Sequence, residues 1–407
     1  MDAVVTPASV LAVLHVEGHS GPQRDLEPRL RRLADGGARI TTMVPADGPA
    51  AELAAGVGDV LHGYPGALVG PRTAFDAARM PGLVLRQARA VAATARSVRA
   101  ELAIASSALL PGALVGARRG GAATLLYSGE PLAAAGWRGA TRGAVARFAG
   151  RRADAVLACS HHVARSYLSR GIEATVLHPP IAVPGDREAI ARRGAELRRR
   201  LGVGAGERLV CSLGAITEGR GQDALVDALA ISARRGRGWR LVIGGESYDR
   251  SPDRAFAARL GRLVDELGLG DRVRFAGGVD DPNALFAAAD LLVNPARVDE
   301  AFGRAACEAL TVGCPVVSTR VGGVVEALTD GETALLVEPD SPPALAAAIE
   351  RLLGAPPLAE RLARAGADDV SRRFDPAVGQ PVFDAAVAAA LAARADRSLK
   401  STPTSFR

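Results

Sequence analysis

Lysine is almost absent from this chain: Lys400 is the only one, and every other member of its 50 basic residues is arginine. Several kinds of active site depend on a lysine at a fixed place. These include Schiff-base enzymes, the phosphate-binding loop that ends in Gly-Lys-Ser or Gly-Lys-Thr, and the kinases, in which a lysine pairs the ATP phosphates. The sequence excludes all three from the body of the chain.

Aromatic and cysteine residues are also scarce. Aromatics make up 4% of the chain, too few for a surface that stacks single-stranded nucleic acid. We therefore expect no nucleic-acid partner, despite a formal net charge of +6. The four cysteines form no Cys-x-x-Cys pair, which predicts free, buried thiols and no metal site built from Cys or His. They are Cys159, Cys211, Cys307 and Cys314.

Targeting signals and long hydrophobic runs are lacking as well. Met1–Leu11 carries Asp2 and no basic residue, unlike a signal peptide. No stretch of about eighteen apolar residues is free of charge, which predicts no membrane span. Together these features predict a cytoplasmic protein. Four arginines on one helical face leave open a peripheral contact with the inner face of a membrane, the alternative being a solvated face: Arg86, Arg89, Arg96 and Arg99.

The chain does have a regular alternation of short apolar runs and longer helical segments. With 407 residues, of which 48% are apolar, it has room for two domains. Runs rich in β-branched residues and leucine suit strands buried on both faces of a parallel sheet. Six fall in each half, which predicts an α/β fold of two doubly wound sheets. They lie at 10–16, 39–44, 102–105, 123–127, 155–159 and 174–177, then at 208–213, 240–243, 272–275, 291–294, 315–318 and 334–337.

A proline cluster marks the break between the two predicted sheets. Pro179, Pro180 and Pro184 follow the last run of the first half. We expect one domain over residues 1–182 and a second over residues 187–372. A helix at 377–393 and a polar, flexible tail at 398–407 should follow.

The segment Asn294–Asp340 holds the residues best suited to chemistry. Glu300 follows a predicted strand, a Phe-Gly turn begins at Phe302, and Glu308 lies one turn into the next helix. The first backbone N–H groups of a helix have no partner within it and suit a phosphate. Here these N–H groups belong to Gly303, Arg304 and Ala305.

This segment resembles the donor site of the retaining glycosyltransferases of family 4. The likeness rests on two glutamates eight residues apart with Phe-Gly between them, followed by GCPVVSTRVGG, Glu326 and DGETALLVEPD. The resemblance implies a GT-B fold, in which two Rossmann-like domains with parallel sheets face each other across a cleft. It also implies that the first domain binds the acceptor, that the second binds the nucleotide-sugar donor, and that the helix at 377–393 crosses back onto the first.

A second segment is similar to the same family. Members carry Gly-Arg-Leu-x-x-x-Lys-Gly after the first strand of the donor domain, and this chain reads GAITEGRG at 214–221. Arg220 takes the place of the family's lysine and keeps a cation for the diphosphate, whereas Ala215 replaces its arginine. The resemblance places donor contacts in this loop, at two further strand ends and in the Phe-Gly turn: Gly214, Ala215, Gly244, Gly277, Val279 and Phe302.

The resemblance also assigns roles. Glu308 would hold the ribose hydroxyls and Glu300 the transferring sugar. Arg220 and the helix-start amides would stabilise the leaving diphosphate of a UDP- or GDP-sugar, with no metal and no other cofactor. Arg304 either folds back to add a second cation or leans into solvent. On the acceptor side, where the likeness is weakest, the candidates are Gly18, His19, Gly21, Tyr127 and Glu130.

Two functions are compatible with this sequence. The first is a retaining glycosyltransferase that moves a hexose-type sugar from a nucleotide-diphosphate sugar to an acceptor hydroxyl. The acceptor would be a natural product, a glycolipid or a cell-envelope glycan. The alternative is a catalytically weak binding or partner protein with the same fold, suggested by Ala215 and by the altered loop at 17–21. The sequence indicates no oligomeric state.

Overall fold

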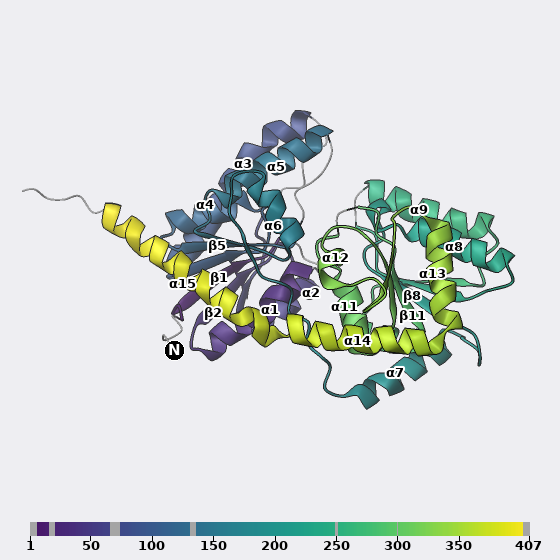
Figure 1. The fold of residues 1–407 in the computed structure, drawn as a ribbon. Helices are drawn as coiled ribbons and strands as arrows, with labels where there is room; N and C mark the ends of the chain where they lie inside the picture. Colours follow the sequence, from purple (N-terminus) through teal and green to yellow (C-terminus); the bar gives the residue numbers. More distant parts are fainter. Residues whose placement is uncertain are drawn as a thin grey trace, which may run out of the picture. The chain divides into compact units, whose positions relative to one another are not determined.

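The computed structural model describes residues 6–15, 21–65, 74–130, 136–248, 251–298 and 300–401 (Figure 1). The chain forms two compact units, each built on one parallel sheet. Unit 1 consists of Met1–Pro180 and Pro376–Arg407, and unit 2 consists of Ile181–Asp375. The first break falls inside the proline cluster, two residues before the expected end of the first domain.

The sheet of unit 1 has seven strands in the order β3-β2-β1-β4-β5-β6-β7. Six correspond to the expected apolar runs. The additional strand, β3, was not expected because it has three residues, of which Asp59 and Leu61 are exposed. The strands are β1 (Ser9–Val13), β2 (Arg39–Met43), β3 (Asp59–Leu61), β4 (Leu102–Ala105), β5 (Ala123–Ser128), β6 (Ala155–Ala158) and β7 (Thr175–Val176).

Helices cover both faces of this sheet (Figure 1). One face is covered by α1 (Gly21–Asp35), α2 (Pro49–Ala55) and α15 (Pro376–Ser401). The other is covered by α3 (Ala74–Ser97), α4 (Pro111–Arg119), α5 (Gly136–Gly150) and α6 (His161–Leu168). This division follows from right-handed crossovers that wind outward in opposite directions from β1 and β4.

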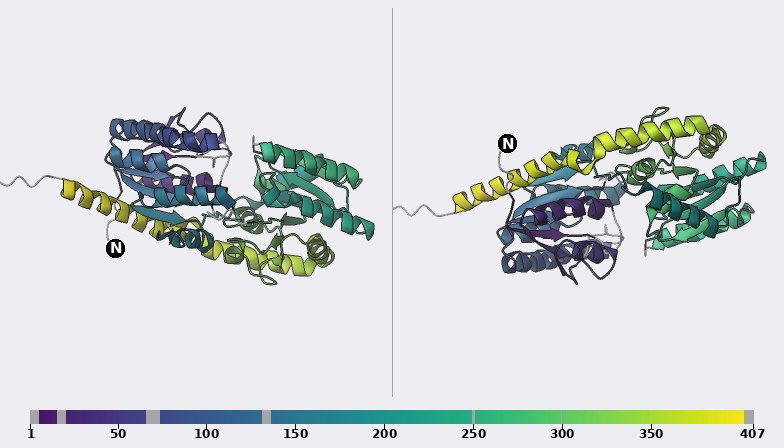
Figure 2. Two further views of the ribbon diagram at one scale, coloured as in Figure 1. Left: turned by 90° about the horizontal axis from the view of Figure 1, so that it is seen from above. Right: turned by 90° about the horizontal axis from the view of Figure 1, so that it is seen from below.

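Helix α15 is the last element of the chain, yet it packs against β4, β5, β6 and α1 of unit 1 (Figure 2). It buries Phe383, Val387 and Ala390, which recur at helical spacing. The helix extends past the expected end at residue 393 to Ser401, so the start of the predicted flexible tail is helical. An ion pair of 2.6 Å between Lys400 Nζ and Asp396, one turn apart, supports this extension.

Among the described residues, one helical stretch, Pro356–Lys400, is long and apolar enough to cross a membrane by length and composition alone. Such a stretch is allowed up to two charged residues, and the expectation of no membrane span stays a prediction. Its most apolar eighteen-residue window reaches a mean hydropathy of 1.3. The core helix of a soluble protein passes the same test, and the α15 part of the stretch is a packing helix of unit 1.

The sheet of unit 2 has six parallel strands in the order β10-β9-β8-β11-β12-β13, and all six were expected. They are β8 (Leu209–Leu213), β9 (Arg240–Gly244), β10 (Val273–Gly277), β11 (Leu291–Asn294), β12 (Val316–Thr319) and β13 (Leu335–Val337). One face carries α8 (Gln222–Arg234), α9 (Ser251–Glu266) and α13 (Pro342–Gly354). The other carries α10 (Pro282–Ala288) and α11 (Arg304–Thr311), flanked by α7 (Arg187–Arg200) and α14 (Pro356–Phe374). The short helices η1 (Glu218–Arg220) and α12 (Val324–Ala327) complete the unit.

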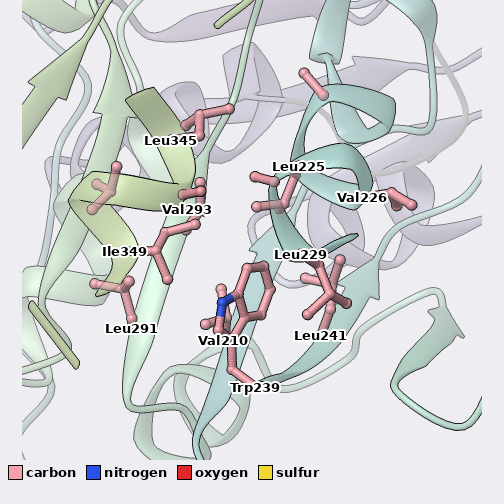
Figure 3. Close-up of a cluster of buried hydrophobic side chains, with 14 of the residues drawn as sticks. Val210, Leu225, Val226, Leu229, Trp239, Leu241, Leu291, Val293, Leu345 and Ile349 are labelled. Carbon is pink, nitrogen blue, oxygen red and sulfur yellow. The ribbon is translucent and has the colours of Figure 1, made fainter. Parts of the chain in front are cut away.

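The core of unit 2 lies between helices α8 and α13 and the central strands (Figure 3). Leu225 and Leu229 of α8 face Ile349 of α13 over the strands, and Trp239 closes the lower end of the cluster in this view. Removing these side chains from water is the main force that holds β8 beside β11. The strands contribute Val210, Leu241, Leu291 and Val293. All four cysteines are free and buried, as the sequence predicted.

Candidate functional site

The residues singled out in unit 2 gather at the carboxyl ends of its strands. From β8 the chain winds outward to β9, whereas from β11 it winds the other way to β12. The loops that follow these two neighbouring strands therefore part from each other. Such a topological switch point is where open α/β sheets bind their ligands.

Close backbone contacts join the loop after β8 to the loop after β11. The Arg297 N–H donates to the Gly219 carbonyl at 2.9 Å. Gly221 has a φ of +66°, and a Cβ on it would lie 2.1 Å from the Pro295 carbonyl oxygen. Only glycine fits there, which explains why Gly221 follows Arg220, the cation of the motif.

The side chain of Arg297 reinforces this junction. Its Nη1 donates to Asp223 at 2.6 Å and to the Glu218 carbonyl at 3.2 Å, and its Nε donates to Asp340. Partial burial lowers the pKa of Arg297, but the bonds to Asp223 and Asp340 outweigh it and raise the pKa overall. Three loops at the ends of β8, β11 and β13 are thereby tied together.

Arg220 and Glu300, 80 residues apart in the sequence, form an ion pair across the switch point. Arg220 ends η1, and its Nη1 donates to a carboxylate oxygen of Glu300. The Glu300 side chain is 11% exposed and that of Arg220 is 38% exposed. The pair thus presents its cation to solvent and keeps its carboxylate sheltered.

The glycine pair after β12 sets the position of Glu300. The Gly323 N–H donates to the Glu300 carbonyl at 2.8 Å. A Cβ on Gly322, whose φ is +54°, would lie 2.1 Å from that same carbonyl oxygen, and one on Gly323 would lie 2.1 Å from the Ala301 carbonyl oxygen. The Gly-Gly element of the motif is therefore required by the close approach of two loops.

Helix α11 begins at the same place. Gly303, with a φ of +91°, is its N-cap residue, and the N–H groups of Ala306 and Cys307 donate to its carbonyl. The Phe302 side chain is 2% exposed and packs edge-on against Phe374, with ring centroids 4.9 Å apart. This packing anchors the start of the helix, and a donor contact at Phe302 stays a prediction.

Glu308 and Arg304 form an ion pair one turn apart on α11. Arg304 Nε donates to Glu308 Oε1 at 2.8 Å, and the side chains are 19% and 11% exposed. The Arg304 guanidinium does not lean into open solvent, and its contact with a diphosphate stays a prediction. Like Arg220 with Glu300, the pair joins a motif glutamate to an arginine.

The other predicted donor contacts lie at the ends of β8, β9 and β10. The Gly214 N–H donates to the Gly244 carbonyl at 3.0 Å, and the Gly245 N–H donates to the Gly277 carbonyl at 2.7 Å. Val279 covers Gly244, where an added Cβ would meet its Cγ2 at 2.7 Å. In the same loop, the Ala215 carbonyl accepts from Gln222 Nε2 at 3.0 Å.

Residues 195–369 match the model of the family described as Glycosyl transferases group 1. The match agrees with the likeness to glycosyltransferases, and it covers the strand ends, the two ion pairs and the glycine pair of unit 2.

Two curated relatives illustrate the extent of the similarity. The alpha-D-kanosaminyltransferase of Streptomyces kanamyceticus is 36% identical over 180 residues, which cover 44% of this chain and 44% of the relative. The D-inositol 3-phosphate glycosyltransferase of Acidothermus cellulolyticus is 36% identical over 182 residues, which cover 42% and 40%. The chain thus spans about two fifths of the length of the curated relatives it matches.

Solved structures match over almost the whole chain. Anabaena HepE in complex with UDP and glucose has a TM-score of 0.78 at 21% identity, covering 93% of this chain and 99% of its own. The sucrose-phosphate synthase from Thermosynechococcus elongatus has a TM-score of 0.73 at 23% identity, covering 95% and 100%. At such identity the likeness shows the fold alone, and the chain has the predicted GT-B fold.

In unit 1, outside the glycosyltransferase group 1 match, Tyr127 is a core residue. It is fully buried, and its hydroxyl donates to Asp25 Oδ2 at 2.7 Å. Burial and the neighbouring Asp25 carboxylate raise its pKa well above the ordinary value. The acceptor-side expectation for Tyr127 is therefore corrected. Gly21 begins α1, and Gly18 and His19 lie outside the described residues.

A polar cluster at the switch point of unit 1 joins Glu130, a predicted acceptor-side residue, to three residues that the sequence did not single out. His15, Ser106, Ser107 and Glu130 follow β1, β4 and β5. His15 Nδ1 lies 2.8 Å from Ser106 Oγ, and its Nε2 lies 3.6 Å from Glu130 Oε1, which accepts from Ser107 Oγ at 2.5 Å. Burial lowers the pKa of His15, and the Glu130 carboxylate opposes this. The missed signal was a polar residue directly after each central strand.

Proposed function

We propose that the protein is a retaining glycosyltransferase that transfers a sugar from a UDP- or GDP-sugar to an acceptor hydroxyl. The observation that carries this proposal is the Arg220–Glu300 pair, placed at the switch point beside the start of α11. The names of relatives agree with it: they include a kanosaminyltransferase and glycosyltransferases of D-inositol 3-phosphate. HepE, of the same fold, was solved with UDP-glucose.

The charges of the site suit a departing diphosphate. Negative charge builds up on the diphosphate as the sugar leaves, and positive groups fixed in advance lower the barrier most. Glu300 fixes the Arg220 cation, so that the guanidinium can be shared between this carboxylate and the diphosphate without reorganising. The first amides of α11 add a second source of positive potential.

The buried pair on α11 would hold the ribose. A carboxylate accepts several hydrogen bonds at once, so the bond from Arg304 does not prevent Glu308 from accepting ribose hydroxyls. Arg304 would fix the orientation of the Glu308 carboxylate. Glu300, at the other loop, would face the transferring sugar, and the His15–Glu130 cluster of unit 1 would lie on the acceptor side.

Two further parts of the proposal concern the groups that neutralise the diphosphate and the cellular compartment. We propose that arginine and helix amides, rather than a metal ion, neutralise the diphosphate. The four free, buried cysteines support a reducing compartment, and we propose the cytoplasm.

A thermal-shift titration tests the donor. UDP, GDP, UDP-glucose and GDP-mannose are each titrated with and without EDTA, and a ligand that binds the folded state raises the melting temperature. We expect one base to stabilise the protein, with EDTA having no effect. Absence of stabilisation by all four ligands contradicts the donor assignment. With the donor identified, the anomeric configuration of the product, read by NMR, tests retention.

A further inference from the structure

Arg29 of α1 is the largest fully buried side chain of the described residues, at 2% exposure. Its Nη2 donates to the His178 carbonyl at 3.2 Å, and its guanidinium lies 5.6 Å from the Phe383 ring centroid. Its Nε and Nη1 have no hydrogen-bond partner in the part of the chain that the structure describes. Buried N–H groups of a cation rarely lack a hydrogen-bond partner. Where the protein supplies none, the usual partner is a bound ion or a water molecule.

A cavity lies against the Arg29 side chain. It has a volume of about 220 Å³, which exceeds the space that a single water molecule needs. Arg29 and Arg32 line it from α1, Pro180 from the segment that leaves unit 1, and Pro376, Ala377 and Gln380 from α15. The prolines have no backbone N–H, so the arginine side chains are its strongest donors.

Two carboxylates lie near the cavity, and each is bonded elsewhere. Asp25 accepts from the Tyr127 hydroxyl at 2.7 Å. Asp384 accepts from Gln380 Nε2 at 2.7 Å and lies 3.8 Å from Arg32 Nη2. The Arg32 side chain, 57% exposed, is accessible to a ligand. The cavity therefore has two arginines in its lining, and the buried Nε and Nη1 of Arg29 still lack an acceptor among the described residues.

We propose that this cavity is a binding site for a small oxyanion, a phosphate or carboxylate group, held by Arg29 and Arg32. Pro180 and Pro376 are the residues at which the chain leaves unit 1 and returns to it. A bound anion would join α1, the leaving segment and the start of α15. This site is separate from the donor site in unit 2, and the inference does not depend on the proposed function.

Calorimetry on the full chain tests the proposal, with inorganic phosphate and sodium acetate as probes at matched ionic strength. The Arg220→Gln background is used throughout, so that phosphate at the proposed donor site does not mask the signal. We expect binding of at least one probe in this background. Absence of binding by both probes overturns the proposal and leaves water as the partner of Arg29.

Three variants locate the bound anion. Arg32→Gln removes a charged donor from an exposed position, and Arg29→Lys keeps the charge but removes Nε and Nη1. We expect each to weaken binding about tenfold, as for the loss of one charge-assisted bond. The control is Arg31→Gln, since Arg31 neighbours Arg32 on α1 but pairs with Glu27 at 2.8 Å, and we expect unchanged affinity.

The outcomes separate the site from a general charge effect. Equal weakening by Arg31→Gln and Arg32→Gln overturns the proposal, as does wild-type affinity in both Arg32→Gln and Arg29→Lys. If circular dichroism shows that Arg29→Lys does not fold, the anion affinities of Arg32→Gln and Arg31→Gln decide whether the proposal holds.

Discussion

Unit 1 and unit 2 wind outward from a central strand in the same way, with the switch between β1 and β4 in one and between β8 and β11 in the other. The switch point of unit 2 carries two arginine–glutamate pairs and a helix start, a set suited to a diphosphate. That of unit 1 carries His15, Ser107 and Glu130, in which the carboxylate accepts from the serine and lies 3.6 Å from the imidazole.

The comparison teaches that the fold sets where a ligand binds and that the side chains set which ligand it is. The family match follows the same division. It covers residues 195–369, which hold the switch point of unit 2, and leaves out unit 1.

Glu300→Gln should have the largest effect, because it removes the charge that fixes Arg220 at the reacting centre. We expect turnover to fall by about a hundredfold or more, with donor affinity changed little. Steady-state kinetics and donor titration measure the two quantities. Glu332→Gln, an exposed acid of the same unit, is the control. Equal losses in turnover and donor affinity would contradict the assigned role.

Glu308→Ala should weaken nucleotide binding by about 1.5–3 kcal/mol, because ribose hydroxyls lose a charged acceptor. Calorimetry with the nucleotide that stabilises the wild type measures this. Arg304→Leu distinguishes the role of Arg304 from that of Glu308. If Arg304 acts by fixing Glu308, the double variant should lose little more nucleotide affinity than Glu308→Ala alone. Additive losses would instead favour a direct contact of Arg304 with the diphosphate.

Gly323→Ala should reduce the free energy of unfolding of unit 2 by about 1–3 kcal/mol, because its Cβ would overlap the Ala301 carbonyl. Urea unfolding followed by circular dichroism measures the change. Gly261→Ala is the matched control: it lies in α9 with nothing within 4 Å of the new Cβ. It should raise stability by about 0.5–1 kcal/mol. A neutral Gly323→Ala would show that the two loops can separate.

Tyr127→Phe should cost about 1–2 kcal/mol of stability, because the buried Asp25 carboxylate loses a donor. The transition of unit 1 in thermal unfolding reports it. Acceptor KM should stay at the wild-type value at a temperature where the variant is folded. A raised KM with unchanged stability would return Tyr127 to the acceptor side.

The smallest predicted effect is a pH dependence of unit 1. Burial holds the folded pKa of His15 below its unfolded value of about 6.5, so the unfolded chain binds more protons in acid. The stability that neutral His15 contributes is fully present above that pH and is lost as the pH falls toward the folded pKa. His15→Gln should flatten the dependence of the melting temperature on pH between pH 7.5 and 5.5.

Local sequence predicted most of the fold because the strands are buried on both faces and read as uninterrupted apolar runs. β3 was not predicted, because its exposed ends leave no apolar run. The end of α15 was not predicted either, because the Asp396–Lys400 pair extends a helix whose apolar face has already ended.

The site was predictable where its residues are close in sequence. The glutamates, the Phe-Gly turn and the glycine pair lie within one motif. The partners of these residues were not predictable, since Arg220 meets Glu300 across 80 residues and Phe302 packs against a distant Phe374. An aromatic residue inside a motif suggests ligand contact, and only tertiary packing reveals that it is an anchor. The His15 cluster depends on strand order, which no local pattern records.

The return of the chain to unit 1 at Pro376 has a consequence for its synthesis. At about 5–20 residues per second, the ribosome needs roughly 10–40 s to pass from Pro180 to Pro376. During that interval unit 2, which is contiguous, can fold completely. The face formed by β4, β5 and β6 must wait for α15, the last helix to emerge. A nascent chain that stops before Pro376 therefore carries a finished unit 2 and an uncovered apolar surface on unit 1, the form in which chaperones and proteases would meet it.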